Sequence, residues 1–392
     1  MVCFVALSAN AQNREIEFKD ASWKDQLARA KKENKLIFFD AYTSWCGPCK
    51  MMAKDVFTKD SVADVFNQAF VDVKYDMEKG EGPALKDKYE VHAYPTYLFI
   101  NGDGELVHKI VGSMSPADLI KEANNALSPG NTLVALANKF NAGDHSEVNT
   151  IAYMDALEKA YEADKMGEVA KIYFDGLAKP TLLEQHNWEL ALKYLNDPSS
   201  KAFAYLYANK AGLGEKYGAD GVNKYFHKTF QSSVYSVKNA YQRKEGINEA
   251  KEKTDAIRKL LASGNEYSKP LLTQLDVTEY AGSNQWDKFS AKVIEVWGDT
   301  DFAQKASFVI DAANDVVNAA PEKYYENALE WANLVEKADP NLFTKIQLAE
   351  LRKRIFRRQG KTTDLEAMTL LASTLRKEAA QKGQMTPPVY KN

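Results

Sequence analysis

KLIFFDAYTSWCGPCK, residues 35–50, is the stretch of sequence that decides the fold of this chain. It opens with the apolar run LIFF at residues 36–39, which is typical of a strand buried on both faces. Cys46 and Cys49 follow after a short turn, and Pro48 between them is compatible with the first turn of a helix. The stretch therefore predicts a buried strand, a turn, and a helix with two cysteines at its N-terminus.

The cysteine pair predicts redox chemistry. A helix N-terminus presents free N–H groups and the positive end of the helix dipole, and both stabilise a nearby thiolate. Two intervening residues bring the sulfurs of Cys46 and Cys49 close enough to bond. We therefore expect an exposed Cys46 thiolate to attack a substrate disulfide, and a partly covered Cys49 to resolve the mixed disulfide.

Two other uses of the cysteine pair have less support. A zinc site needs four ligands, but the five histidines form no closely spaced pair and no second CxxC exists. A purely structural disulfide would close a very small loop and would stabilise the fold little. The sequence thus predicts no metal ion and no cofactor.

The residues around the cysteine pair alternate between helical and extended patterns. Helices are predicted at residues 23–34, 46–56, 61–68 and 84–89 and from 115 onward, and strands at 36–39, 70–75, 96–100 and 106–111. The sequence NGDG at residues 101–104 is typical of a hairpin turn between the last two strands. Strands that alternate with helices predict a central sheet with helices on both faces, and hence an α/β domain over residues 13–128.

This α/β domain resembles the thioredoxin family. The resemblance spans residues 16–126 and is carried by residues 35–50, by YPT at 94–96 and by VGS at 111–113. The sequence KDVFT at residues 54–58 is also similar to the C-terminal thioredoxin-like domain of the periplasmic reductase DsbD. The resemblance implies a thioredoxin-like fold and a thiol–disulfide oxidoreductase activity.

The resemblance also implies roles for residues outside the cysteine pair. Asp40 stands where the family has a buried acid that accepts the proton of Cys49. Burial at the end of an apolar strand would raise its pKa toward neutrality, whereas a strand-end carboxylate in water would not be perturbed. Lys74 is the only candidate for a basic partner of Asp40. The sequence does not fix how the strand of Lys74 is aligned with that of Asp40, so Lys74 is not included in the predicted site.

A substrate-binding rim is implied by four further positions. Pro95 matches the cis-proline of the family, and a cis bond would turn the backbone of Tyr94 toward the dithiol, where it can pair with a substrate strand. Trp45, Tyr94 and Gly112 would form a flat apolar rim around it. The polar loop DMEKGEGP at residues 76–83 is longer than that of thioredoxin and would narrow or extend this surface.

The sequence changes character after SPG at residues 128–130. From residue 131 to 383, apolar residues recur every three or four positions between Gly and Pro breakers, which predicts helical hairpins stacked as a solenoid. Residues 324–341 are similar to the second half of a tetratricopeptide repeat. The basic cluster RKRIFRR at 352–358 is expected to be a solvated helix face, and the tail 384–392 is expected to be disordered.

The N-terminus indicates export. Residues 1–11 resemble a truncated signal peptide, because a short apolar run precedes Ala9-Asn10-Ala11, which fits the A-x-A cleavage rule. Removal of Cys3 with this segment would leave one dithiol, which suits an oxidising compartment such as the periplasm. The alternative is an ordinary frayed terminus, in which case we expect a cytoplasmic protein.

Composition excludes several classes of function. The 392 residues carry a net charge of −3 and are 45% hydrophobic, which is typical of a globular protein with more than one domain. No strongly basic stretch indicates nucleic-acid binding, and no apolar run reaches the roughly 20 residues of a membrane span.

The predicted function is the reduction of protein disulfides, because the Gly47-Pro48 dipeptide resembles that of reductases more than that of strong oxidants. An oxidase or isomerase remains an alternative direction for the same dithiol. Such a reductase needs a thiol electron donor, for example a membrane thiol transporter. The alternative from another class is a helical-repeat scaffold that binds a partner and carries an accessory redox domain.

Overall fold

The structure, a computed structural model, describes residues 14–387 except Glu266, Ala303 and Asp339. The predicted signal segment with Cys3, and residues 388–392 of the predicted disordered tail, lie outside the described residues. Residues 384–387 form neither helix nor strand. The chain divides into two compact units, one that ends at Leu195 and one that begins at Asn196.

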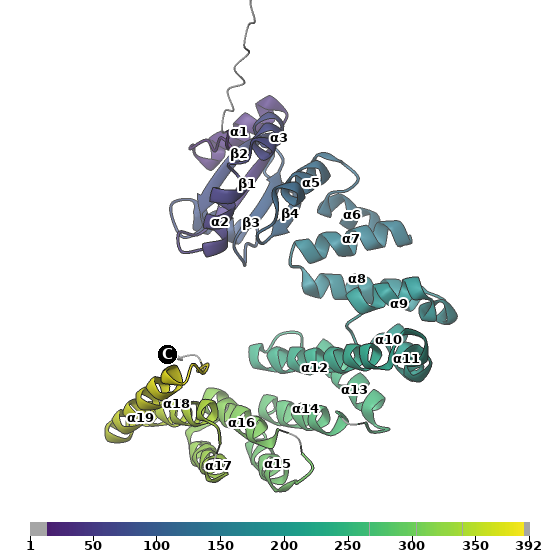
Figure 1. Ribbon diagram of the computed structural model, residues 1–392. Helices are drawn as coiled ribbons and strands as arrows, with labels where there is room; N and C mark the ends of the chain where they lie inside the picture. The colour runs from purple at the N-terminus through teal and green to yellow at the C-terminus, as the bar shows by residue number, and fades with distance from the viewer. Residues whose placement is uncertain (1–13, 266, 303, 339, 388–392) are drawn as a thin grey trace, which may run out of the picture. The chain divides into compact units, whose positions relative to one another are not determined.

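The first unit opens with an α/β domain (Figure 1, purple to blue). Its elements in chain order are α1 (Trp23–Glu33), β1 (Leu36–Tyr42), α2 (Gly47–Asp55), α3 (Asp60–Ala69), β2 (Phe70–Asp76), α4 (Gly82–Lys88), β3 (Thr96–Ile100), β4 (Leu106–Val111) and α5 (Pro116–Leu127). The α/β class and the order of helices and strands predicted from the sequence are confirmed.

The four strands form one mixed sheet in the order β2-β1-β3-β4. β1 runs parallel to β2 and antiparallel to β3, and β3 pairs antiparallel with β4 across the predicted hairpin turn. Because β1 and β3 have neighbours on both sides, their backbones are fully paired within the sheet. β4 lies at one edge of the sheet, and its outer side needs another element to cover it.

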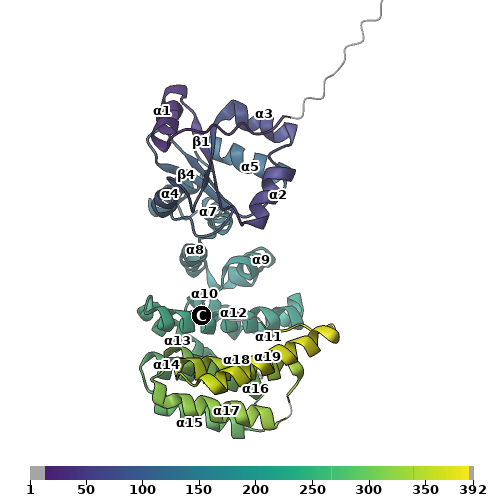
Figure 2. The ribbon, with the colours of Figure 1, turned by 90° about the vertical axis from the view of Figure 1, so that its left-hand side faces the viewer.

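Alternate residues of β1 face two separate cores. Phe38 packs with Met52 of α2 and with apolar residues of α3 and α5. Its neighbour Phe39 packs on the other face with Trp23 of α1 and with Leu85 of α4. Figure 2 shows the same layers, with α1 and α4 on one side of the sheet and α2, α3 and α5 on the other. Each buried phenylalanine contributes about 1.5–3 kcal/mol to folding.

Four helices and one short 3₁₀ helix complete the first unit. They are α6 (Leu133–Asn141), α7 (Glu147–Lys159), α8 (Ala163–Gly176), η1 (Lys179–Leu183) and α9 (Gln185–Tyr194). Helices α6 and α7 contact the edge strand β4 (Figure 1). The sequence predicts a domain boundary at residues 128–131, and the α/β elements do end there. The compact unit nevertheless continues to Leu195, and its helices α6 and α7 cover the edge of the sheet.

A buried polar cluster joins α6 and α7 to the α/β domain. His108 on β4 accepts a hydrogen bond at Nδ1 from the backbone N–H of Leu133 at 3.1 Å, so its Nε2 carries the proton toward Glu122, 3.2 Å away. Lys159 at the end of α7 donates to the other oxygen of Glu122 at 2.5 Å. Burial raises the pKa of Glu122, but the hydrogen bonds from His108 and Lys159 outweigh this effect and lower the pKa to about 2.

The described residues of the second unit form helices and no strand. Its elements are α10 (Lys201–Ala208), α11 (Lys210–Tyr217), α12 (Ala219–Arg243), α13 (Ile247–Leu261), α14 (Ser268–Gly282), α15 (Trp286–Gly298), α16 (Lys305–Ala319), η2 (Glu322–Tyr324), α17 (Tyr325–Lys337), α18 (Leu342–Arg358) and α19 (Thr362–Gln381). From α12 to α19 each helix contacts the next, and α12, α14, α16 and α18 also contact one another in turn. The predicted succession of stacked helical hairpins is confirmed.

The expectation of a solvated basic face on α18 is wrong for Arg352 and Arg354, whereas Arg357 and Arg358 are exposed as expected. Arg352 and Arg354 are both buried. Arg352 donates to Glu336 of α17 at 2.7 Å, and Arg354 donates to Asn314 of α16 at 2.8 Å. Arg352 and Arg354 point inward because each guanidinium has a hydrogen-bond partner on a neighbouring helix. No described helix is long and apolar enough to cross a lipid bilayer.

Candidate active site

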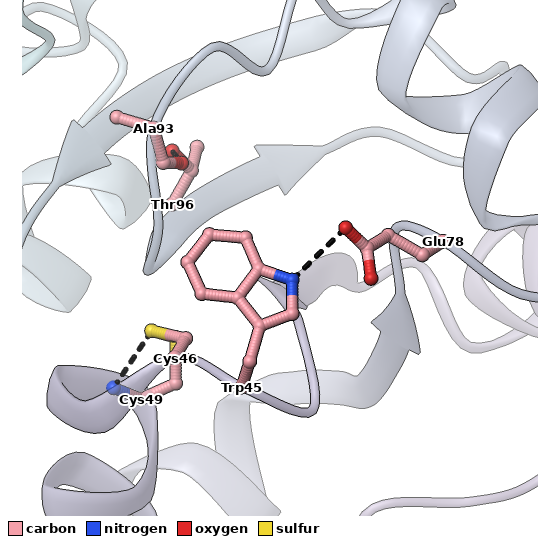
Figure 3. Close-up of a disulfide and its surroundings, with 6 residues drawn as sticks. All are labelled: Trp45, Cys46, Cys49, Glu78, Ala93 and Thr96. Carbon is pink, nitrogen blue, oxygen red and sulfur yellow. Dashed lines mark hydrogen bonds between the residues drawn. A yellow bond between two sulfur atoms is a disulfide. The ribbon is translucent and has the colours of Figure 1, made fainter. Parts of the chain in front are cut away.

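The two cysteines lie at the N-terminus of α2, directly after β1. Cys46 is the N-cap residue, and its Sγ accepts a hydrogen bond from the backbone N–H of Cys49 at 3.1 Å (Figure 3). The backbone N–H of Cys46 donates to Thr43 O at 3.1 Å, which closes the turn between strand and helix. Pro48 stands in the first helical turn, where its missing N–H removes no helical hydrogen bond.

The structure shows the oxidised form, with a disulfide between Cys46 and Cys49 and 5.3 Å between their Cα atoms. Only 3% of Cys46 and 7% of Cys49 is exposed, so the expectation that Cys46 is the more exposed of the two is wrong for this form. The physical reason is local. The N-cap hydrogen bond and the bond to Cys49 both hold the side chain of Cys46 over the first turn of the helix.

Asp40 lies in the middle of β1, opposite Lys74 on β2 and Tyr97 on β3. It is only 6% exposed, and its Oδ1 has no hydrogen-bond partner among the described residues. Burial raises the pKa of Asp40 to about 7, and the positive charge of Lys74 acts in the opposite direction. The alternative of a strand-end carboxylate in water is therefore wrong, and Lys74 is the basic neighbour that the sequence left open.

The alternation of side chains along β1 places Asp40 on the same face of the sheet as the cysteine helix. Asp40 stands two residues after Phe38, so the two side chains share one face. Phe38 packs with Met52, which lies one helical turn after Cys49 on α2. The buried acid and the second cysteine thus belong to the same layer of the domain, between β1 and α2.

A second loop brings Pro95 and Gly112 together. The Tyr94–Pro95 peptide bond is cis, as predicted. The backbone N–H of Gly112, which follows β4, donates to Pro95 O at 2.8 Å. Gly112 has a φ of 95°, a left-handed conformation that a residue with a side chain rarely adopts. On the other side of Pro95, the Thr96 hydroxyl donates to Ala93 O at 2.8 Å (Figure 3).

Trp45 lies on the surface beside the disulfide and is 64% exposed (Figure 3). Its ring contacts that of Tyr94 edge to face, with 5.9 Å between the centroids. Its Nε1 donates to Glu78 Oε1 at 2.9 Å, which fixes the orientation of the exposed indole. Of the three predicted rim residues, Trp45 and Tyr94 are thus in contact, and Gly112 is joined to them through Pro95.

Glu78 was not among the predicted site residues. It belongs to the long loop of residues 76–83, which the sequence marked as unusual without showing which side chain matters. This loop closes tightly, because a Cβ atom on Gly82 would lie 1.9 Å from the backbone oxygen of Asp76. Only glycine allows that approach, so Gly82 sets the path of the loop and thereby the place of Glu78 beside Trp45.

The described residues contain no group of three or more His, Cys, Asp or Glu side chains that could hold a metal ion. The chemical groups at this site are therefore a cysteine pair that can open and close a disulfide, a buried acid that titrates near neutrality, and an exposed aromatic surface. This set can exchange thiols and disulfides with a substrate that contacts the surface.

Comparisons with known proteins agree with the geometry. A family model of a thioredoxin-like domain matches residues 23–127. Thioredoxin H4 of Arabidopsis thaliana is 38% identical over 91 residues, which are 23% of this chain and 71% of that protein. A putative disulphide-isomerase from Bacteroides thetaiotaomicron is 49% identical, with a TM-score of 0.28 over 30% of this chain and 98% of that chain. The C-terminal domain of Neisseria meningitidis DsbD is 22% identical, with a TM-score of 0.25 over 28% and 98%.

Proposed function

This chain belongs to the thioredoxin family, and we propose that it reduces the disulfides of protein substrates through Cys46 and Cys49. The observation that carries the proposal is the bonded cysteine pair at the N-terminus of α2, on the sheet face that also buries Asp40. Both cysteines lie at the first turn of one helix, so the disulfide can open and close there.

In the proposed reaction the reduced protein attacks the substrate. The Cys46 thiolate bonds to one sulfur of the substrate disulfide, and the other substrate sulfur leaves as a thiolate that takes up a proton. The Cys49 thiolate then attacks Cys46 Sγ, and the second substrate sulfur leaves. Two electrons and two protons pass to the substrate, and the protein ends with the Cys46–Cys49 disulfide that the structure shows.

Asp40 serves as the base for Cys49 in this proposal. A carboxylate with a pKa of about 7 takes and releases a proton at neutral pH, whereas an ordinary aspartate would hold none. Its free Oδ1 leaves room for such a proton. Lys74 tunes the group, because its charge opposes part of the effect of burial.

Trp45, Tyr94, Pro95 and Gly112 form the proposed binding surface. An extended substrate segment would pair with the backbone of Tyr94 and lay its side chains on the exposed indole of Trp45. The packing of α6 and α7 on β4 favours a helical region that serves the substrates of this dithiol. We therefore place the independent scaffold second, as the alternative function.

We also propose an electron donor and a location. Each turnover leaves the protein oxidised, so a thiol donor of lower reduction potential must reduce it again. Export to the periplasm would make a membrane thiol transporter the source of these electrons. N-terminal sequencing of the mature protein from fractionated cells tests the location. A retained Met1 in the cytosolic fraction would contradict it.

The function is tested by the reduction of insulin disulfides with dithiothreitol as donor. We expect Cys46→Ser to abolish catalysis and Cys49→Ser to trap a mixed disulfide with the substrate. Cys3→Ser is the matched control, and it should leave the rate unchanged. Full activity of the Cys46→Ser protein would overturn the proposal. The reduction potential of the dithiol separates a reductase from an oxidase or isomerase.

A further inference from the structure

Tyr161 has an unusual place at the end of α7. The backbone N–H groups of Tyr161 and Glu162 donate to Glu158 O at 3.1 Å and to Leu157 O at 2.9 Å, the two bonds of a Schellman motif. Tyr161 takes the left-handed position of that motif, with a φ of 58°, where glycine is usual. A bulky residue in this conformation is strained, and its side chain is nevertheless 64% exposed, so no burial offsets the strain.

Two ion pairs hold this turn against the thioredoxin-like domain. Lys159, two residues before Tyr161, donates to Glu122 on α5 at 2.5 Å. Glu162, the next residue after Tyr161, accepts from Lys109 on β4 at 2.7 Å. The side chains of Glu122 and Lys109 are only 6% and 7% exposed, so both contacts lie on fixed parts of the domain. The backbone of Tyr161 is thus held on both sides by contacts with the domain.

These contacts place the Tyr161 side chain next to the proposed substrate surface. A Cβ atom built on Gly112 would lie 3.1 Å from the hydroxyl oxygen of Tyr161. Gly112 itself donates to Pro95 O, so the tyrosine ring stands beside the loop that carries the cis-proline. Because the ring comes from the helical region, it is an addition to the surface that the α/β domain forms alone.

We propose that Tyr161 is a specificity-determining residue that favours disulfides flanked by an aromatic or large apolar side chain. The inference rests on the proposed reductase function and deepens it. A substrate segment on the rim would have Trp45 on one side and the exposed ring of Tyr161 beyond Gly112. Aromatic pairs favour edge-to-face or offset contacts, and a tyrosine has only two side-chain torsions, so its ring loses little freedom on binding.

The test uses the pre-reduced full chain and two oxidised peptide disulfides that differ only next to one cysteine, with phenylalanine in one and serine in the other. Second-order rate constants are measured by rapid mixing, acid quench and thiol alkylation. We expect the phenylalanine peptide to react faster, and Tyr161→Gly to lower the ratio of the two rate constants about three- to tenfold. Tyr161→Phe should keep the ratio, because it keeps the ring.

Tyr235→Ala is the matched control. Tyr235 is 66% exposed on α12 and is not part of the proposed surface, so its loss should leave the ratio unchanged. Glycine suits the backbone of residue 161, so thermal unfolding of Tyr161→Gly should show no loss of stability. An unaltered ratio in Tyr161→Gly would overturn this inference while leaving the reductase function intact. A wild-type protein that reduces neither peptide would overturn the function itself.

Discussion

The parallel strands β1 and β2 and the α18 helix bury charged groups in opposite ways. On the sheet, Asp40 and Asp72 are both buried, and each leaves its Oδ1 without a partner among the described residues. On α18, buried Glu350 accepts from Lys353 at 2.8 Å, and buried Arg352 donates to Glu336. A paired buried charge holds helices together, whereas an unpaired carboxyl shifts its pKa and becomes able to titrate.

The largest expected effect comes from Asp40→Asn. The pKa of Asp40 is raised from 3.8 to about 7, so the folded state binds the proton more tightly than the unfolded state. Stability should therefore fall as the pH rises from about 4 to 7 and then level off. The variant should be more stable than wild type by about 4 kcal/mol at pH 8 and unchanged at pH 4, at about 1.4 kcal/mol per pKa unit.

The same variant should react more slowly in the Cys49 step, because no base remains for its proton. Hydrogen exchange of the β1 and β3 amides measures the stability, and the pH–rate profile of insulin reduction measures the chemistry. A profile identical to that of wild type would remove Asp40 from the mechanism.

Asp72→Asn sharpens the comparison, because Asp72 is a buried acid of the same sheet with no proposed role. Burial raises its pKa to about 7 as well, and the nearby charges are those of Arg29, Lys35 and Glu17. We expect a similar gain of stability at pH 8, about 4 kcal/mol, with no change in the rate of insulin reduction. Equal losses of activity in both variants would show that the effect of Asp40 is structural.

Glu350→Ala tests the other side of the comparison. Its carboxylate also lies 3.3 Å from Arg376 of α19, so the variant removes a carboxylate that two cations share. We expect α18 and α19 to lose at least ~3 kcal/mol, measured by hydrogen exchange of their amides. An unchanged exchange rate would show that the buried pairs contribute nothing.

The smallest effect is expected for Glu78→Gln, which weakens the hydrogen bond to Trp45 without removing it. The indole should become more mobile, and the rate constant with protein disulfides should fall by no more than about threefold. Time-resolved anisotropy of Trp45 fluorescence, in a chain whose other tryptophans are replaced by phenylalanine, measures the mobility. Glu81→Gln, on the same loop, is a suitable control for the loss of charge.

The sequence was sufficient for the parts of the molecule that depend on local pattern. The strand around Phe38, the helix that opens at Cys46 and the hairpin turn at residues 101–104 each follow from a short stretch. The burial of Asp40 follows from its place in an apolar strand. These features could be predicted because the residues that decide them are neighbours in sequence.

The remaining features depend on contacts between distant segments. Glu78 reaches Trp45 across 33 positions, and no local pattern marks it. The position of Tyr161 beside Gly112 and the covering of β4 by α6 and α7 depend on where α7 packs. The periodicity of apolar residues does not predict that packing. The burial of Arg352 on α18 has the same cause. The sequence of a basic helix is the same whether its arginines face solvent or the acidic side chains of a neighbouring helix.

The bond from Leu133 to His108 has a consequence for any attempt to transplant the redox domain. A graft that ended after α5 would remove the hydrogen bond from Leu133 to His108 and the ion pair of Lys159 with Glu122. It would also expose the edge strand β4 to solvent. Such a chimera would have to include α6 and α7, or carry substitutions that provide new hydrogen-bond partners for His108 and Glu122. In this molecule the recognisable family segment is therefore shorter than the piece that can be moved.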